Sequence, residues 1–168
     1  MRCALTLVAP LVLVLAAAAP ASAAPPAHDP FAPLNVDFAA GEVCDFNLRL
    51  ESTELKAKAI TFDRHDGAFR QNLTGMIVQR ATNLDTGASV TRNSSGPGRV
   101  SINAAGHVVI SFGGASLLTF FEGDVTGRGL LYIKGGGAEF EIGGDGFFYV
   151  RADMPAHVED VCATLTPG

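Results

Sequence analysis

Positive charge is scarce in this 168-residue sequence, and no basic cluster is denser than the pair Lys56 and Lys58. Without Arg2, which we place in a leader below, the 12 basic residues fall to 11 against 17 acidic ones, a formal net charge of −6. Nucleic acids and anionic membranes attract a concentrated positive surface, because binding releases the counterions of their phosphates. We therefore expect neither nucleic acid nor an anionic membrane as a partner.

Long apolar runs are absent beyond the first two dozen residues. Arg2 precedes an apolar run from Ala4 to Ala19, which is short for a membrane span, and the small residues 21–23 (ASA) offer a cleavage site. We interpret residues 1–23 as a signal peptide of bacterial type. Cleavage leaves 145 of the 168 residues, enough for one domain with its own core. The mature chain is expected to be secreted, extracellular and free of membrane segments.

Cysteine is rare as well. Of three cysteines, Cys3 lies in the predicted signal peptide, which leaves Cys44 and Cys162 in the mature chain. An even number of cysteines in an oxidising compartment favours a disulfide, although two separate buried thiols are the alternative. A Cys44–Cys162 bridge would close a loop of 118 positions. On the chain-entropy account, it would stabilise the fold by roughly 4 to 5 kcal/mol.

Glycine, in contrast, is abundant, and all 19 glycines follow the predicted signal peptide. Turn signals that start with Asp or Asn, or are rich in glycine, stand at 63–67, 83–87, 103–106 and 143–146. Between such turns, apolar and polar residues alternate with period two, as in residues 44–51. This pattern predicts hairpins of short strands with one face toward a core.

The predicted architecture is all-β. We expect a single antiparallel β-barrel of about eight to ten short strands with hairpin connections, and a two-sheet β-sandwich is the alternative. Residues 24–37 are rich in proline and alanine and read as an extended leader to a domain at 38–168. Gly75 indicates a bulge, and 158–164 a helical turn. The expected strands are 42–50, 56–62, 68–81, 88–93, 99–103, 107–113, 117–121, 129–134, 138–142 and 147–151.

Histidines at metal-ligand spacing are lacking. His28, His65, His107 and His157 are far apart in the sequence, and a zinc site needs three or four convergent ligands. The turn at 63–66 (DRHD) misses the spacing of a calcium loop and its terminal glutamate. We therefore predict no metal site and no cofactor.

Catalytic motifs are lacking too. The segment 114–118 (GASLL) lacks the final glycine of a serine-nucleophile elbow. Glu139 and Glu141 form a pair of carboxylates that glycoside chemistry could use, but residues two apart on a strand usually form the wet side of a sheet. We assign no catalytic residue, and the hypothesis that the protein is an enzyme is the less favoured one.

One hairpin departs from simple alternation. The segments 117–121 (LLTFF) and 130–133 (LLYI) place apolar side chains on both faces. Either another segment covers the outer face, with residues 147–149 (FFY) as the expected cover, or the apolar surface lines a pocket or contacts a partner.

Three groups of residues carry a family resemblance. The segments 41–46 (GEVCDF), 82–98 (TNLDTG to NSSGPG) and 160–162 (DVC) resemble a group of uncharacterised small secreted β-barrel proteins of actinobacteria. The resemblance covers nearly the whole mature chain. It implies a barrel of lipocalin-like or allene-oxide-cyclase-like shape, and it brings no activity and no functional residues.

The leading functional hypothesis is a binding module that holds a small apolar ligand inside a barrel or at its mouth. Its expected lining is Phe112, Phe120, Leu131, Phe140 and Phe148. The second hypothesis is a secreted interaction or inhibitory domain that uses its loops or the 117–133 surface against another secreted protein. The third is a barrel-type cyclase or isomerase that acts mainly by shaping an apolar substrate.

Overall fold

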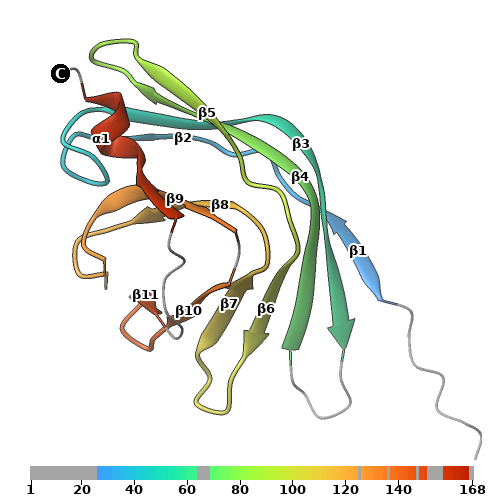
Figure 1. Cartoon of the computed structure of the whole chain (residues 1–168). Helices are drawn as coiled ribbons and strands as arrows, with labels where there is room; N and C mark the ends of the chain where they lie inside the picture. The colour runs from blue at the N-terminus through green and yellow to red at the C-terminus, as the bar shows by residue number, and fades with distance from the viewer. Residues whose placement is uncertain are drawn as a thin grey trace, which may run out of the picture.

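The computed structural model describes residues 26–63, 69–124, 126–135, 137–146, 148–150 and 157–166 (Figure 1). The predicted signal peptide and the turn that holds His65 lie outside these residues. No helix within them has the length and apolar character to cross a membrane.

The described residues form twelve strands and one short helix, and every strand pair is antiparallel. Nine strands make a large sheet in the order β1-β3-β4-β6-β7-β10-β11, with β2 on β3 and β5 on β4, and three make a small sheet in the order β12-β9-β8. The bounds are β1 Ala27–Pro30, β2 Asn35–Phe38, β3 Leu48–Asp63, β4 Phe69–Asn83, β5 Ser89–Asn93, β6 Gly98–Ile102, β7 Val108–Phe112, β8 Ser116–Phe120, β9 Gly129–Lys134, β10 Ala138–Ile142, β11 Phe148–Val150, β12 His157–Asp160 and α1 Val161–Leu165.

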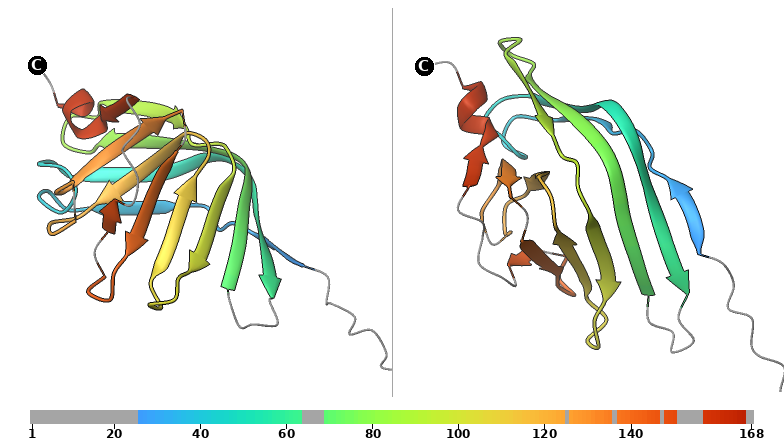
Figure 2. Two further views of the ribbon diagram at one scale, coloured as in Figure 1. Left: turned by 60° about the horizontal axis from the view of Figure 1, so that its bottom comes forward. Right: turned by 45° about the vertical axis from the view of Figure 1, so that its right-hand side comes forward.

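Two long strands form the spine of the large sheet. β3 has 16 residues and β4 has 15, and each carries two short strands end to end on its far edge. On β3 these are β2 and β1, and on β4 they are β5 and β6. The β3–β4 register shifts between Ser52 and Glu54, which places a β-bulge at Thr53. The spine curves strongly, so that both halves of the large sheet bend toward the small one (Figure 2).

The β8–β9 hairpin forms a middle layer. Leu117, Leu130 and Tyr132 on one of its faces join a core cluster with Leu48 and Leu50 of β3. On its other face, Phe120 and Ile133 pack in a second cluster with Phe140 of β10. Other strands thus cover both faces of the hairpin, which explains why it is apolar on both. The suggested cover at 147–149 rests on side chains outside the described part of the chain.

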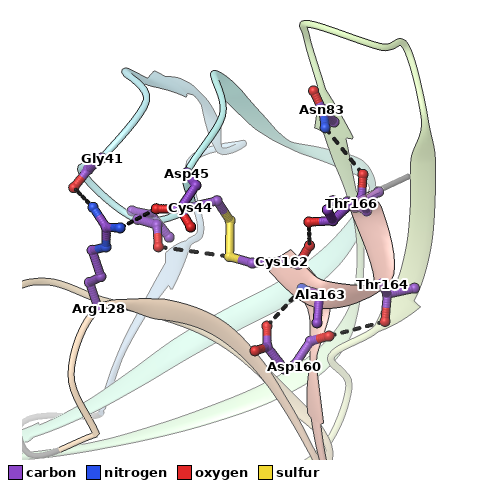
Figure 3. Close-up of a disulfide and its surroundings, with 12 residues drawn as sticks. Gly41, Cys44, Asp45, Asn83, Arg128, Asp160, Cys162, Ala163, Thr164 and Thr166 are labelled. Atoms are coloured by element: carbon purple, nitrogen blue, oxygen red, sulfur yellow. Dashed lines mark hydrogen bonds and ion pairs between the residues drawn. A yellow bond between two sulfur atoms is a disulfide. The ribbon is translucent and has the colours of Figure 1, made fainter. Parts of the chain in front are cut away.

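The disulfide joins the two ends of the fold and confirms the predicted Cys44–Cys162 pair (Figure 3). Cys162 lies in α1, whose first turn is capped by the Asp160 side chain, which accepts from the Ala163 N–H at 3.0 Å. The buried Asn83 Nδ2 at the end of β4 donates to the Leu165 carbonyl at 3.1 Å. The C-terminal helix is therefore tied to the start of the domain and to the spine.

The all-β antiparallel prediction is confirmed, but the single closed barrel is wrong. The strands form two sheets that do not close into one ladder. The chain leaves the large sheet after β7, enters its concavity as the β8–β9 hairpin, and returns as β10 to pair with β7. Gly114 permits this departure, because a Cβ there would lie 2.6 Å from the Gly96 Cα. The turn signals in the sequence predicted that consecutive strands pair with each other. Between β7 and β8, and between β9 and β10, the chain instead passes from one sheet to the other.

Most strand positions agree with the sequence prediction, and three local predictions do not. The first two expected strands are one strand, β3, and residues 42–47 precede it as a turn. The bulge lies at Thr53, whereas Gly75 pairs in regular register with Ala57. Within the expected leader 24–37, β1 and part of β2 add edge strands to the large sheet, which the sequence analysis did not foresee.

Gly75 gives a test of the bent spine. Its φ is +126°, and a Cβ there would lie 2.2 Å from the Lys56 carbonyl oxygen. We expect Gly75→Ala to lower the free energy of unfolding by at least about 3 kcal/mol, measured by urea denaturation. The control Gly87→Ala has the same unfavourable sign of φ but open space around it, and should lose only about 1 to 2 kcal/mol. Equal losses in the two variants would contradict a close approach of β3 and β4.

Reduction of the disulfide gives a second test. Since the bridge closes a loop with a sequence separation of 118, its loss should lower the free energy of unfolding by about 4 to 5 kcal/mol. Guanidinium denaturation with and without a reductant measures this difference. The double variant Cys44→Ser/Cys162→Ser should match the reduced protein. A reduced protein that is as stable as the oxidised one would show that the bridge does not restrain the unfolded chain.

Candidate functional site

A cavity of about 200 Å³ lies on the inner face of the large sheet, which we define as the face toward the small sheet. We call it the bend cavity. Gly75, Ile77 and Gln79 of β4 form one wall, the segment 94–98 forms a second, and the connection from β7 to β8 forms a third. The cavity therefore lies where the spine, the β5–β6 connection and the chain's change of sheet meet.

The cavity follows from a gap in the strand pairing of β4. β6 pairs with β4 residues 70–73 and β5 with residues 78–82, so no strand of the described chain pairs with residues 74–77 on this edge. The connection between β5 and β6 spans the gap: the Ser94 N–H donates to the Ile77 carbonyl at 2.8 Å, and Ser95 Oγ accepts from the Ile77 N–H at 3.1 Å. Because Gly75 has no side chain, the space beneath this connection stays open.

Four polar residues line the bend cavity, of which Thr74 is exposed and the other three are more buried. The Ser94 hydroxyl is buried and has no hydrogen-bond partner. Gln79 is only 9% exposed, and its side-chain amide makes no hydrogen bond within the described part of the chain. Ser116 is buried as well. Because buried polar groups nearly always have a partner, an unpaired hydroxyl at a cavity wall marks a place where a bound molecule can supply one.

The remaining lining is mainly apolar. Leu117 and Leu118 enter from β8, and Phe112 enters from the end of β7. Phe31, from the segment between β1 and β2, lines another side, where its N–H donates to the Ala57 carbonyl at 3.4 Å. The arrangement suits a small, mostly apolar molecule with one hydrogen-bonding group.

The five residues that the sequence analysis expected to line a ligand site do not line one common cavity in the structure. Phe112, Phe120, Leu131 and Phe140 belong to one cluster, in which the Phe140 ring lies 6.3 Å from that of Phe112 and 5.6 Å from that of Phe120. Phe120 and Phe140 are at most 1% exposed and fill the core. Phe112 is the member that also lines the bend cavity. Phe148 lies in β11 opposite Ile142, and its side chain is outside the described part.

Sequence reasoning missed the polar residues of the bend cavity. One signal for Gln79 was present: it stands between Ile77 and Ala81 in the inward-facing phase of β4. No local pattern marked Ser94, because its burial depends on a connection that crosses a gap between two strands.

The structure also brings together a histidine and a glutamate that sequence spacing did not connect. His107 Nδ1 lies 2.6 Å from Glu141 Oε1, and Asn103 Nδ2 donates to the same oxygen at 2.9 Å. A carboxylate in this position orients the imidazole ring, as in many acid–base sites. The group is partly exposed at the β6–β7 turn, with the His107 side chain 35% and the Glu141 side chain 21% exposed.

Two further candidates of the sequence analysis, the Glu139–Glu141 pair and a metal site, can be checked among the described residues. Glu139 and Glu141 lie on the same face of β10, on the side opposite the core residue Phe140. No group of three or more His, Cys, Asp or Glu side chains in the described part could hold a metal ion. His28 and His157 lie in β1 and β12, and the turn of His65 is outside the described residues.

Comparison with known proteins assigns no family to this chain: no protein-family model, curated protein or solved structure matches it. Functional inference therefore depends on the cavities, contacts and charges of the chain itself.

An ion pair bridges the two sheets at their far edges. Arg92 of β5 binds Glu159 of β12 through two hydrogen bonds, of which the Nε–Oε2 bond is 3.0 Å long. Arg92 also lies over the Tyr132 ring, and the Tyr132 hydroxyl donates to the Asn93 carbonyl at 2.8 Å. The hydrogen bonds from Arg92 lower the pKa of Glu159, while partial burial acts in the opposite direction.

The lowered pKa of Glu159 predicts a pH-dependent contribution to stability. Because the pKa of Glu159 is lower in the folded state than its usual value of 4.5, the ionised side chain stabilises the fold at pH values above 4.5. This contribution disappears as the pH falls through the lower pKa of the folded state. Glu159→Gln should lower the free energy of unfolding by about 1 to 2 kcal/mol at neutral pH. The difference from the unmodified protein should shrink toward about pH 3 in denaturation series.

The control is Asp37→Asn, which breaks a similar two-bond pair with Arg49 on the exposed surface. Solvent screens that pair, so the variant should change little at any pH. A Glu159→Gln deficit that stays constant with pH would contradict an ionic contribution from Glu159.

Proposed function

We propose that this chain is an exported binding module that holds a small, mainly apolar molecule with one polar group in the bend cavity. The observation that carries the proposal is the buried, unpaired Ser94 hydroxyl at the wall of an otherwise mostly apolar space. The signal-peptide pattern and the Cys44–Cys162 disulfide support export. The proposal keeps the apolar-ligand hypothesis of the sequence but places the ligand beside the spine, not inside a barrel.

The volume limits the ligand. An apolar cavity of about 150 Å³ holds benzene, so about 200 Å³ corresponds to a ligand of roughly six to ten non-hydrogen atoms. A single substituted ring fits this space, whereas a long acyl chain or a fused-ring lipid exceeds it.

The polar groups set the expected selectivity. A buried hydroxyl without a partner costs roughly 1 to 3 kcal/mol, and a ligand that pairs with Ser94 recovers part of that loss. Gln79 offers both a donor and an acceptor on another part of the wall. A ring with a hydroxyl group should therefore bind more tightly than the same ring without one.

A matched pair of ligands tests this expectation. We expect benzyl alcohol to bind the mature, oxidised protein about tenfold more tightly than toluene, measured by ligand-observed NMR. Ser94→Ala removes the unpaired hydroxyl and should abolish most of that preference without weakening toluene. An unchanged preference in Ser94→Ala would assign the selectivity to another group.

A cavity-filling variant tests the location. Ala115 lines the bend cavity, so Ala115→Leu should abolish binding of both ligands while the protein stays folded. Ala163→Leu adds the same side chain at an exposed position of α1 and serves as the control. Binding that survives in a folded Ala115→Leu protein, or no binding of either ligand to the unmodified protein, would overturn the proposal.

A further inference from the structure

The large sheet has a second concavity, a groove of about 720 Å³ that crosses β3, β4, β6, β7 and β10. Its polar side chains project from the outer face of the sheet, opposite the inner face that holds the bend cavity. We call it the outer groove. The two spaces share wall residues, among them Leu73 and Gly98, but the row described next does not contact the bend cavity.

Five residues of the groove form one continuous row across five strands. Ile60 pairs with Asn72, Asn72 with Arg99, Arg99 with Ser111, and Ser111 with Glu139. Directly opposed residues of antiparallel strands share a face, so all five side chains stand on the same side of the sheet. At a strand spacing of about 4.8 Å, the row extends over about 19 Å.

Small residues beside the row form the rest of the groove. Gly113 and Gly137 line it without side chains, and Pro97 adds a flat apolar surface next to Thr74. The Gly113 N–H donates to the Pro97 carbonyl at 2.7 Å, so the backbone segments at this place lie close together. The groove is therefore shallow and partly apolar, with hydrogen-bonding groups along one side.

Two members of the row have unmet interactions. Asn72 Oδ1 is buried and has no hydrogen-bond partner. Arg99, directly opposite Asn72, is exposed and forms neither an ion pair nor a side-chain hydrogen bond within the described part of the chain. Neighbouring side chains thus offer an unpaired acceptor and an unpaired guanidinium, with the Ser111 hydroxyl next to Arg99.

We propose that the outer groove binds an oligosaccharide that carries a carboxylate. A guanidinium pairs with a carboxylate through two parallel hydrogen bonds, which assigns the acidic group to Arg99. Sugar hydroxyls both donate and accept, so they satisfy Asn72 Oδ1 and Ser111 together. The glycine and proline surface accepts the apolar C–H face of a sugar ring. Among the described residues that line the groove, Arg99 carries the one positive charge and Glu139 the one negative charge, so the ligand carboxylate belongs at the Arg99 end of the row.

The probe is trigalacturonate, with cellotriose as the neutral counterpart, titrated into the mature, oxidised protein and followed by ¹H–¹⁵N NMR. We expect shift changes to concentrate at Asn72, Arg99 and Ser111 and to be larger for trigalacturonate. Arg99→Gln should weaken trigalacturonate at least tenfold and leave cellotriose within about twofold. Because Arg99 is exposed, this variant should keep the spectrum of the folded protein elsewhere.

Arg80→Gln is the matched control. It removes the same charge from the outer face of β4, eight residues and about 26 Å along the strand from Asn72, where Arg80 pairs with Glu51. Affinity within twofold of the unmodified protein is the expected result. Equal losses in the two arginine variants would indicate general attraction of an anion, and would overturn the site. Shift changes confined to the bend cavity, or no binding of trigalacturonate, would also overturn the outer-groove site. Neither outcome would change the benzyl alcohol result, which tests the bend cavity separately.

Discussion

The architecture depends on the need to bury both faces of one hairpin. β8 and β9 carry large apolar side chains on each side, and a hairpin of this kind is stable in water only between two covers. The bent large sheet supplies both covers, with β3 and β4 on one face of the hairpin and β7 and β10 on the other. The half with Leu48 and Leu50 packs on one face, and the half that leads to β7 and β10 packs on the other.

The bend has structural consequences that create the candidate sites. Along the far edge of β4, β5 and β6 pair with separate parts of the curved strand and leave the gap at residues 74–77. The bend cavity lies under that gap. On the opposite face, Gly113 after β7, Gly137 before β10 and Pro97 before β6 leave the outer groove beside the Arg99 row. Both concavities therefore lie where strands end and connections begin, and they share wall residues such as Leu73 and Gly98.

Side-chain and covalent links replace the strand pairing that a closed barrel would provide. The Cys44–Cys162 bridge holds α1 against the turn before β3, and Arg128 binds the Gly41 carbonyl at 2.7 Å and the Asp45 carboxylate from the end of the β8–β9 connection (Figure 3). Arg92 and Glu159 join β5 to β12 across the open side. Among the described strands no ladder joins the small sheet to the large one, and these links hold it in the concavity.

The sequence by itself determined the strand-rich character, most strand positions and the disulfide. Alternation and glycine turns act over a few residues, and the two cysteines outside the predicted signal peptide allow a single intramolecular pair. Only the tertiary structure decided that β10 returns to β7, that β3 is one long strand, and that Ser94, Gln79 and Arg99 reach the candidate sites. These outcomes depend on which distant segments cover the two apolar faces of β8 and β9. Local patterns do not encode that choice, because the same alternation suits any partner strand.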